Sequence, residues 1–221
     1  LKDYLNIEKY FPLRILILNG DDVTFVTHGK LGIPLAYKFL EEVEKVPLNL
    51  MVNGQSRAIE MSACAGVAIV KSHFPFYRAY ELSEELISSA KNKAKEDANG
   101  TKKVPSALDV HVIQSGITTD LETIRKKYYT RDNKSLQARP WIINQSDLGF
   151  FRYEEAVRYF LDKDKGWPRS RLKALRNAML TSQEEKEVVK LSAESRNYQW
   201  PKFDDKIIFD AVELMDMYVH L

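Results

Sequence analysis

Apolar and polar positions in the first half of the chain alternate between the two-residue period of strands and the 3.6-residue period of helices. Two apolar runs, over residues 13–18 and 23–26, flank the tetrapeptide Asn19-Gly20-Asp21-Asp22. Asn-Gly between such runs is the strongest short-range signal for a β-hairpin. The elements predicted in order are the end of a helix over 1–11, a hairpin over 13–27, a helix over 31–45, a strand over 58–71, a helix over 76–96 and a strand over 107–114.

The predicted strand around Cys64 is apolar on both faces, which is typical of a central strand covered on both sides. Gly66 inside this strand indicates a bulge or the close approach of another backbone. The order helix, hairpin, helix, strand, helix, strand indicates an α+β fold. We expect a mostly antiparallel sheet with helices on one face.

The second half of the chain has a different pattern. Residues 117–149 are mixed and polar, with a short apolar piece at 140–143. From residue 150 onward, apolar side chains recur at helical spacing. Ser182 with Glu185 three positions later resembles a capping box, and a last helix over 204–219 has a wide apolar face. The predicted parts are an α+β domain over 1–116, a connecting segment over 117–149 and a small helical module over 150–221.

Composition narrows the class of protein. The chain has 221 residues, of which 44% are hydrophobic and 29% charged, as in a globular protein with an adequate core. The net charge of +2 is too small to indicate nucleic-acid binding by bulk electrostatics. The single cysteine, Cys64, excludes a disulfide within the chain, which suits a reducing cytosol. No apolar run approaches the roughly 20 residues of a membrane span, so a cytoplasmic location without a membrane partner is expected.

The tetrapeptide at the hairpin tip is the strongest candidate for chemistry. Adjacent carboxylates at Asp21 and Asp22 repel each other, and a divalent cation with a preference for oxygen ligands would compensate them. Mg²⁺, or Mn²⁺ in its place, is the usual cation where phosphates are handled. Asn, Gly and Asp are also ordinary turn residues, so a generic α+β domain with a solvated turn stays open. None of the four histidines has a metal-ligand partner at a convincing spacing.

Three features together resemble the palm domains of nucleotidyl cyclases and polymerases. The hairpin has Asn19-Gly20-Asp21-Asp22 where the family has Gly-Gly-Asp-Asp. A strand of the family's form Ser-Ala-Gly-Val/Ile-Ala follows, here as Ser62-Ala63-Cys64-Ala65-Gly66-Val67-Ala68, and then a helix with Ala90-Lys91 near its end. The chain is most similar to the second palm of the type III CRISPR large subunit, the family that synthesises cyclic oligoadenylates. Diguanylate cyclases, with Gly-Gly-Asp-Glu-Phe, share this palm.

The resemblance implies a nucleotidyltransferase or cyclase reaction. A ribose hydroxyl would attack the α-phosphate of a nucleoside triphosphate, with ATP the expected substrate. Asp21 and Asp22 would be the catalytic and metal-binding residues. Gly20 would let the backbone approach a phosphate, and Lys91 would direct its ammonium at a β- or γ-phosphate. The residues implied in nucleotide binding are Asn19, Gly20, Ser62 and Lys91.

The resemblance also implies partners. In that family two palms face each other inside an RNA-containing complex, so a second palm or a second copy of this chain is expected. The family's first strand, which carries another metal-binding Asp, would lie upstream of Leu1 in a longer protein, since Asp3 falls in a predicted helix. Asn19 at a glycine position and the missing strand support a second hypothesis. In that hypothesis the chain is a catalytically silent palm that acts as an interaction or assembly module.

Overall fold

A computed structural model describes residues 12–52, 55–100, 104–113, 120–144, 148–164 and 166–220. The helix expected over 1–11 and the domain boundary expected at 116 lie outside these residues. The first part contains β1 (Leu13–Asn19), β2 (Asp22–Thr27), α2 (Gly29–Lys45), β3 (Leu48–Val52), β4 (Gln55–Ile59), β5 (Cys64–Ile69), α3 (Phe76–Ala98) and β6 (Ala107–Val112). The second part contains α4 (Leu121–Tyr128), β7 (Thr130–Arg131), β8 (Lys134–Ser135), β9 (Trp141–Ile142), α5 (Phe150–Leu161), α6 (Arg169–Thr181), α7 (Gln183–Glu194), α8 (Asp205–Leu214) and the 3₁₀ turn η1 (Met215–Met217).

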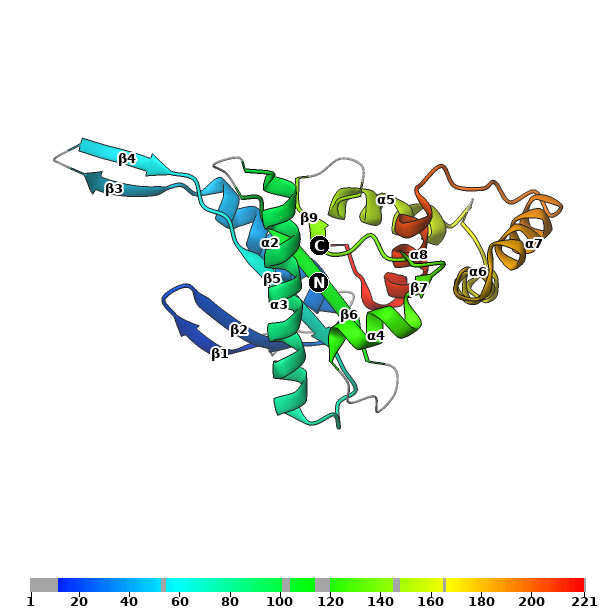
Figure 1. Cartoon of the computed structure of the whole chain (residues 1–221), viewed down its shortest axis with the longest axis horizontal. Helices are drawn as coiled ribbons and strands as arrows, with labels where there is room; N and C mark the ends of the chain where they lie inside the picture. Colours follow the sequence, from blue (N-terminus) through cyan, green and yellow to red (C-terminus); the bar gives the residue numbers. More distant parts are fainter. Residues whose placement is uncertain are drawn as a thin grey trace.

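The strands form several small sheets and confirm the α+β class. Three pairs, β1–β2, β3–β4 and β7–β8, are antiparallel hairpins. The central sheet has the order β5-β6-β9, in which β6 pairs with β9 in the antiparallel direction and with β5 in the parallel direction. The helix α3 connects the parallel pair, and a crossover of this kind is what parallel neighbours require (Figure 1). Most described pairings are antiparallel, as expected, but the central pair is not.

The prediction of a single long strand over 58–71 is wrong. The chain forms β4 up to Ile59 and starts β5 at Cys64, and residues 60–63 belong to no strand. β4 pairs with β3, which directly precedes it, and their hairpin extends away from the rest of the molecule (Figure 1). Apolar side chains on this hairpin, such as Met51 at 71% exposure, have little protein around them. The apolar run therefore belongs to two different sheets.

Helices cover both faces of β5, so the expectation of helices on one face is wrong for this strand. A Cβ on Gly66 would lie 2.4 Å from the carbonyl oxygen of Ser83, which places α3 against that face. A Cβ on Gly32 of α2 would lie 3.0 Å from the side chain of Val67, the next residue of β5. Successive strand residues point to opposite faces, so α2 and α3 are on opposite sides. The close backbone approach predicted at Gly66 is confirmed, and so is the covering of this strand on both faces.

The largest hydrophobic cluster joins the first part of the chain to the second. It contains buried residues of α2, β5 and β6 together with residues of α5, α6 and α8. Stacked aromatic rings connect the two parts: the ring centroids of Trp141 (β9) and Tyr153 (α5) are 4.4 Å apart, and those of Tyr37 (α2) and Phe150 (α5) are 4.1 Å apart. The helical elements therefore share a core with the sheet.

Local signals set several of the helix ends. The side chain of Ser182 accepts a hydrogen bond from the Glu185 backbone N–H at 3.1 Å, which confirms the predicted start of α7. The last helix ends at Leu214 and continues as η1, earlier than the predicted end at 219. The connecting segment contains α4, which the sequence did not predict and which Asp120 caps by accepting from Thr123 at 2.8 Å.

Candidate functional site

The tetrapeptide forms the tight turn that the sequence predicts. Asn19 pairs with Asp22, so the two turn residues are Gly20 and Asp21. Gly20 has φ +60, and glycine at the first central position with positive φ is the pattern of a type II′ hairpin turn. No atom lies within 4 Å of the Cβ that another residue would place at Gly20. The backbone at the tip is therefore open to an approaching ligand.

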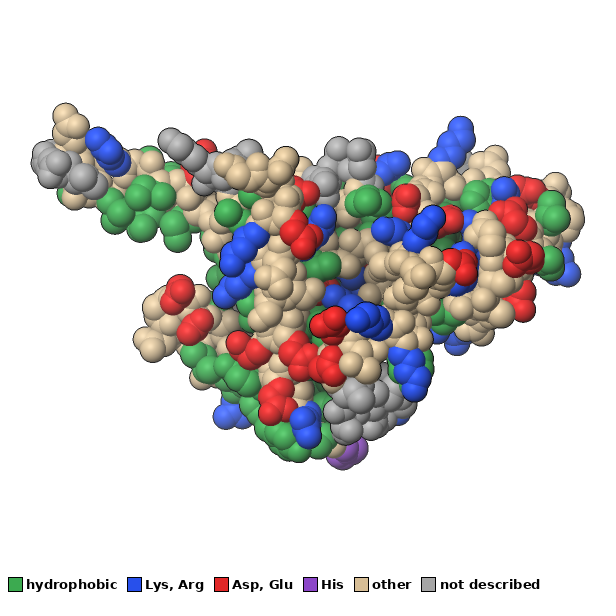
Figure 2. Space-filling model, viewed as in Figure 1, with side chains coloured by type: hydrophobic (Ala, Val, Ile, Leu, Met, Phe, Trp, Pro, Cys, Tyr) green, Lys and Arg blue, Asp and Glu red, His purple; other side chains and the backbone are tan. Residues whose placement is uncertain are grey.

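The two carboxylates at the tip are exposed, and among the described residues neither forms an ion pair. Figure 2 shows acidic side chains at the tip of the β1–β2 hairpin and on the neighbouring part of α3. The charges of Glu84 and, to a smaller extent, Asp22 raise the pKa of Tyr80 on α3. The hairpin tip thus lies within electrostatic range of the first half of α3. This concentration of negative charge favours a bound cation.

Lys91 lies further along α3, and Ser62 lies just before β5. Burial raises the pKa of the Cys64 thiol, and the nearby charge of Lys91 opposes that shift. Lys91 therefore lies close to the start of β5, where Ser62 precedes the strand, and both side chains are exposed. Tyr80 and Lys91 are three helical turns apart, or about 16 Å along the axis, and share one stripe of α3. The described interactions do not bring Lys91 to the carboxylates of the hairpin.

Asp21 and Asp22 are the residues of the hairpin tip that could hold a metal ion. Within the described ranges, no three residues among His, Cys, Asp and Glu are arranged to hold a metal ion. Mg²⁺ is often held by one or two carboxylates together with water and substrate phosphates. Asp21 and Asp22 fit that partial role, and their open position leaves room for the remaining ligands. The arrangement can bind a divalent cation together with a phosphate group.

A buried ionic network connects α6 and α8 with the segment before β9, and it was not predicted from the sequence. Asp210 of α8 accepts hydrogen bonds from the backbone N–H of Arg139 at 2.9 Å and from the Trp141 indole at 3.1 Å. Glu213, one turn later, pairs with the Arg139 guanidinium and with Arg176 of α6 at 2.9 Å. Burial raises the pKa of Asp210 to about 6, although Arg139 opposes it. Two acids three residues apart on the otherwise apolar face of α8 could have indicated this network from the sequence.

Burial also opposes the ionisation of Glu213, but Arg139 and Arg176 hold its pKa below the usual value. Every charged group of the network has an opposite charge beside it. The network therefore serves to join α6 and α8 to the segment before β9.

No protein-family model matches the sequence, and no curated protein is significantly similar to it. In the part of the chain that the structure describes, no helix has the length and apolar character that crossing a membrane requires.

Proposed function

We propose that the chain is a palm-type domain that binds a nucleoside triphosphate and Mg²⁺ at the tip of the β1–β2 hairpin. The observation that carries the proposal is the pair of exposed, unpaired carboxylates on a tight turn with an open glycine backbone. The proposed reaction is attack of a ribose hydroxyl on the α-phosphate of an ATP-like nucleotide, as in nucleotidyltransferases and cyclases. Its proposed setting is a prokaryotic defence or signalling system of the CRISPR type.

Each proposed role follows from the position of the residue. Asp21 and Asp22 hold the cation, which neutralises charge on the phosphate oxygens. Gly20 presents no side chain that would keep a phosphate away from the backbone. Lys91 lies about 16 Å further along α3 than Tyr80, and Ser62 precedes β5 in the same region, so both would contact the far end of an extended nucleotide or a second nucleotide. A facing palm, from a second copy or another chain, would complete the site.

A second candidate is a silent palm that acts as an assembly module. It is favoured by one observation: the described residues contribute two carboxylates and no third metal ligand beside them. Under this alternative the hairpin tip is a solvated turn, and Asp21 and Asp22 bind neither metal nor nucleotide.

Calorimetric titration of ATP with and without Mg²⁺ tests the proposal. The test variant replaces both carboxylates, Asp21→Asn and Asp22→Asn, and so removes charge while keeping residues that suit a turn. The matched control is Asp132→Asn at the tip of the β7–β8 hairpin, where Asp132 is 87% exposed and has φ +50. We expect Mg²⁺-dependent binding in the wild type and in the control, and at least tenfold weaker binding in the double variant.

The result separates the two candidates. Mn²⁺ titration followed by electron paramagnetic resonance gives a second measure of metal binding that does not depend on the nucleotide. Equal affinity in the wild type and the double variant would contradict a metal site at the hairpin. Absence of any Mg²⁺-dependent binding in the wild type would favour the silent module.

A further inference from the structure

A pocket lies between the central sheet and the helices α6 and α8. Its volume is about 510 Å³, within the range of small-molecule sites. One wall consists of residues at or just after the carboxyl ends of β5 and β6, from Ile69 to Lys71 and Val112 to Ile113. Ligands of parallel sheets commonly bind outside the carboxyl ends of the strands. The opposite wall belongs to α6, α8 and η1.

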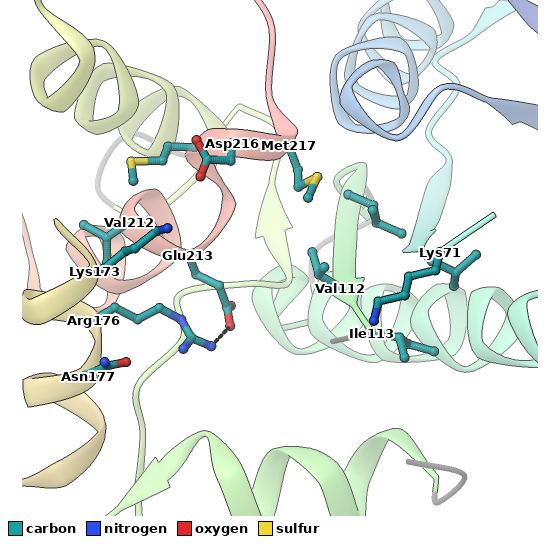
Figure 3. A pocket seen from close by; sticks show the side chains of 13 residues that line it. Lys71, Val112, Ile113, Lys173, Arg176, Asn177, Val212, Glu213, Asp216 and Met217 are labelled. Carbon is teal, nitrogen blue, oxygen red and sulfur yellow. Dashed lines mark hydrogen bonds and ion pairs between the residues drawn. The ribbon is translucent and has the colours of Figure 1, made fainter. Parts of the chain in front are cut away.

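Basic side chains approach this pocket from both walls. Lys71 follows β5, and Lys173 and Arg176 lie one turn apart on α6. Figure 3 shows the Lys71 and Lys173 side chains extending toward the pocket from opposite sides. Among the described residues, neither ammonium forms an ion pair. The buried Nε of Arg176 has no hydrogen-bond acceptor in the same part of the chain.

The two acidic residues of the lining already have basic partners. Glu213 pairs with Arg139 and, at 2.9 Å, with Arg176 (Figure 3). Asp216 pairs with Arg169. These acids therefore do not neutralise the two lysines. The two positive charges of Lys71 and Lys173 remain available to a ligand.

Apart from Asn177, the rest of the lining is apolar. Val112, Ile113, Val212, Met215 and Met217 form much of the surface between the basic groups. Apolar side chains with a few convergent polar groups are the usual composition of a small-molecule site. A ligand that fits this lining carries a compact negative charge on an apolar or aromatic body.

We propose that this pocket binds a small organic phosphate, with the phosphate between Lys71 and Lys173 and the body against Val112 and Met217. A phosphate dianion matches the charge of two ammonium groups. The proposal is independent of nucleotide binding at the hairpin, because none of these residues belongs to β1 or β2. A ligand held here contacts both the sheet and the helices, so it would stabilise their junction.

Isothermal titration in EDTA tests the pocket without the metal-dependent site. The probes are AMP and phenyl phosphate, which share the charged group and differ in the body, with inorganic phosphate and adenosine as the separate parts. The test variant is Lys71→Gln with Lys173→Gln, and the control is Lys126→Gln with Lys202→Gln, two exposed lysines outside the pocket. A parallel series repeats every measurement with Asp21→Asn and Asp22→Asn added to each protein.

We expect one or both organic phosphates to bind with a Kd below 1 mM, and each separate part at least tenfold more weakly. The pocket variant should lose at least tenfold in affinity, whereas the control pair and the hairpin substitutions should change it less than twofold. Tighter binding of AMP would identify the apolar part of the ligand as a nucleoside, and tighter binding of phenyl phosphate would identify it as a simple aromatic group. No binding of either organic phosphate, or an equal loss in the pocket and control variants, would overturn the proposal. A loss of binding in EDTA that follows the hairpin substitutions would overturn it as well.

Discussion

Arg125 of α4 forms a two-pronged ion pair with Asp109 at the centre of β6. Its Nη1 donates to Asp109 Oδ2 at 2.8 Å and its Nη2 to Oδ1 at 2.6 Å. The Asp109 side chain is fully buried, and Nη1 also donates to Ser89 Oγ of α3 at 3.0 Å. One guanidinium therefore connects α4, the central sheet and α3. Planar geometry of this kind is specific to arginine.

Replacement of Arg125 should destabilise the fold strongly. Arg125→Ala leaves the Asp109 carboxylate buried without its counter-ion, which costs about 3–5 kcal/mol. Urea unfolding followed by circular dichroism measures the loss. The control is Lys126→Ala on the next residue, whose side chain is 79% exposed and should change stability by no more than about 0.5 kcal/mol. Similar losses in both variants would argue against the buried pair.

Gly66→Ala should separate α3 from β5. The new methyl group would lie 2.4 Å from the Ser83 carbonyl oxygen and 2.8 Å from the Ile87 backbone nitrogen. Backbone atoms cannot rotate away as a side chain can, so we expect a loss of about 1–3 kcal/mol or more. Thermal unfolding of Gly66→Ala and of the control Gly29→Ala checks this, since a Cβ on Gly29 meets only the Ile69 side chain at 3.4 Å. An unchanged melting temperature in Gly66→Ala would contradict the close approach.

Acid should destabilise the protein through His111. Burial, with help from Arg139 and Arg125, lowers the pKa of His111 from 6.5 to about 4. Between these pH values the unfolded chain binds a proton that the folded chain does not. The contribution of neutral His111 to the free energy of unfolding is therefore fully present above pH 6.5. It falls as the pH decreases toward 4, by at most about 3 kcal/mol. Urea unfolding of the wild type and His111→Leu between pH 7 and 4.5 measures the effect.

The same comparison separates His111 from Asp210. The Asp210 pKa is raised from 3.8 to about 6, so the folded chain binds the extra proton and this contribution to stability falls as the pH increases through that range. Both proteins contain Asp210, so its contribution cancels in the difference. The wild type should lose more stability than His111→Leu on acidification. Parallel pH profiles would exclude the role of His111, and a nuclear magnetic resonance titration of the imidazole gives the pKa directly.

Glu213→Gln should weaken the junction between α6, α8 and the segment before β9. The substitution removes the charge that compensates both Arg139 and Arg176, of which Arg139 has a fully buried side chain. Breaking a buried ion pair from one side costs about 3–5 kcal/mol. Chemical denaturation compares it with Glu187→Gln, at an acid whose side chain is 45% exposed and pairs with Lys190 at 3.6 Å; this control should have little effect on stability. Equal stability of the two variants would show that the network is dispensable.

The sequence by itself determined the features that depend on neighbours along the chain. The hairpin around Gly20 and Asp21, the long helix α3 and the Ser182 cap rest on turn preferences, periodicity and hydrogen bonds that span a few residues. The exposed carboxylate pair at the hairpin tip belongs to the same group. These local signals could be interpreted without knowing where any other segment lies.

The tertiary structure alone decided the direction of the β5–β6 pair, the division of the predicted strand over 58–71, and the placement of α2 and α3 on opposite faces of β5. It also decided which polar groups pair. Asp109 pairs with Arg125, 16 residues away, and Asp210 accepts a hydrogen bond from the backbone of Arg139, 71 residues away. Hydrophobic burial has no direction, so an apolar run does not specify its partner. The pocket between Lys71 and Lys173 exists for the same reason, because folding brings together two segments that nothing in the local sequence connects.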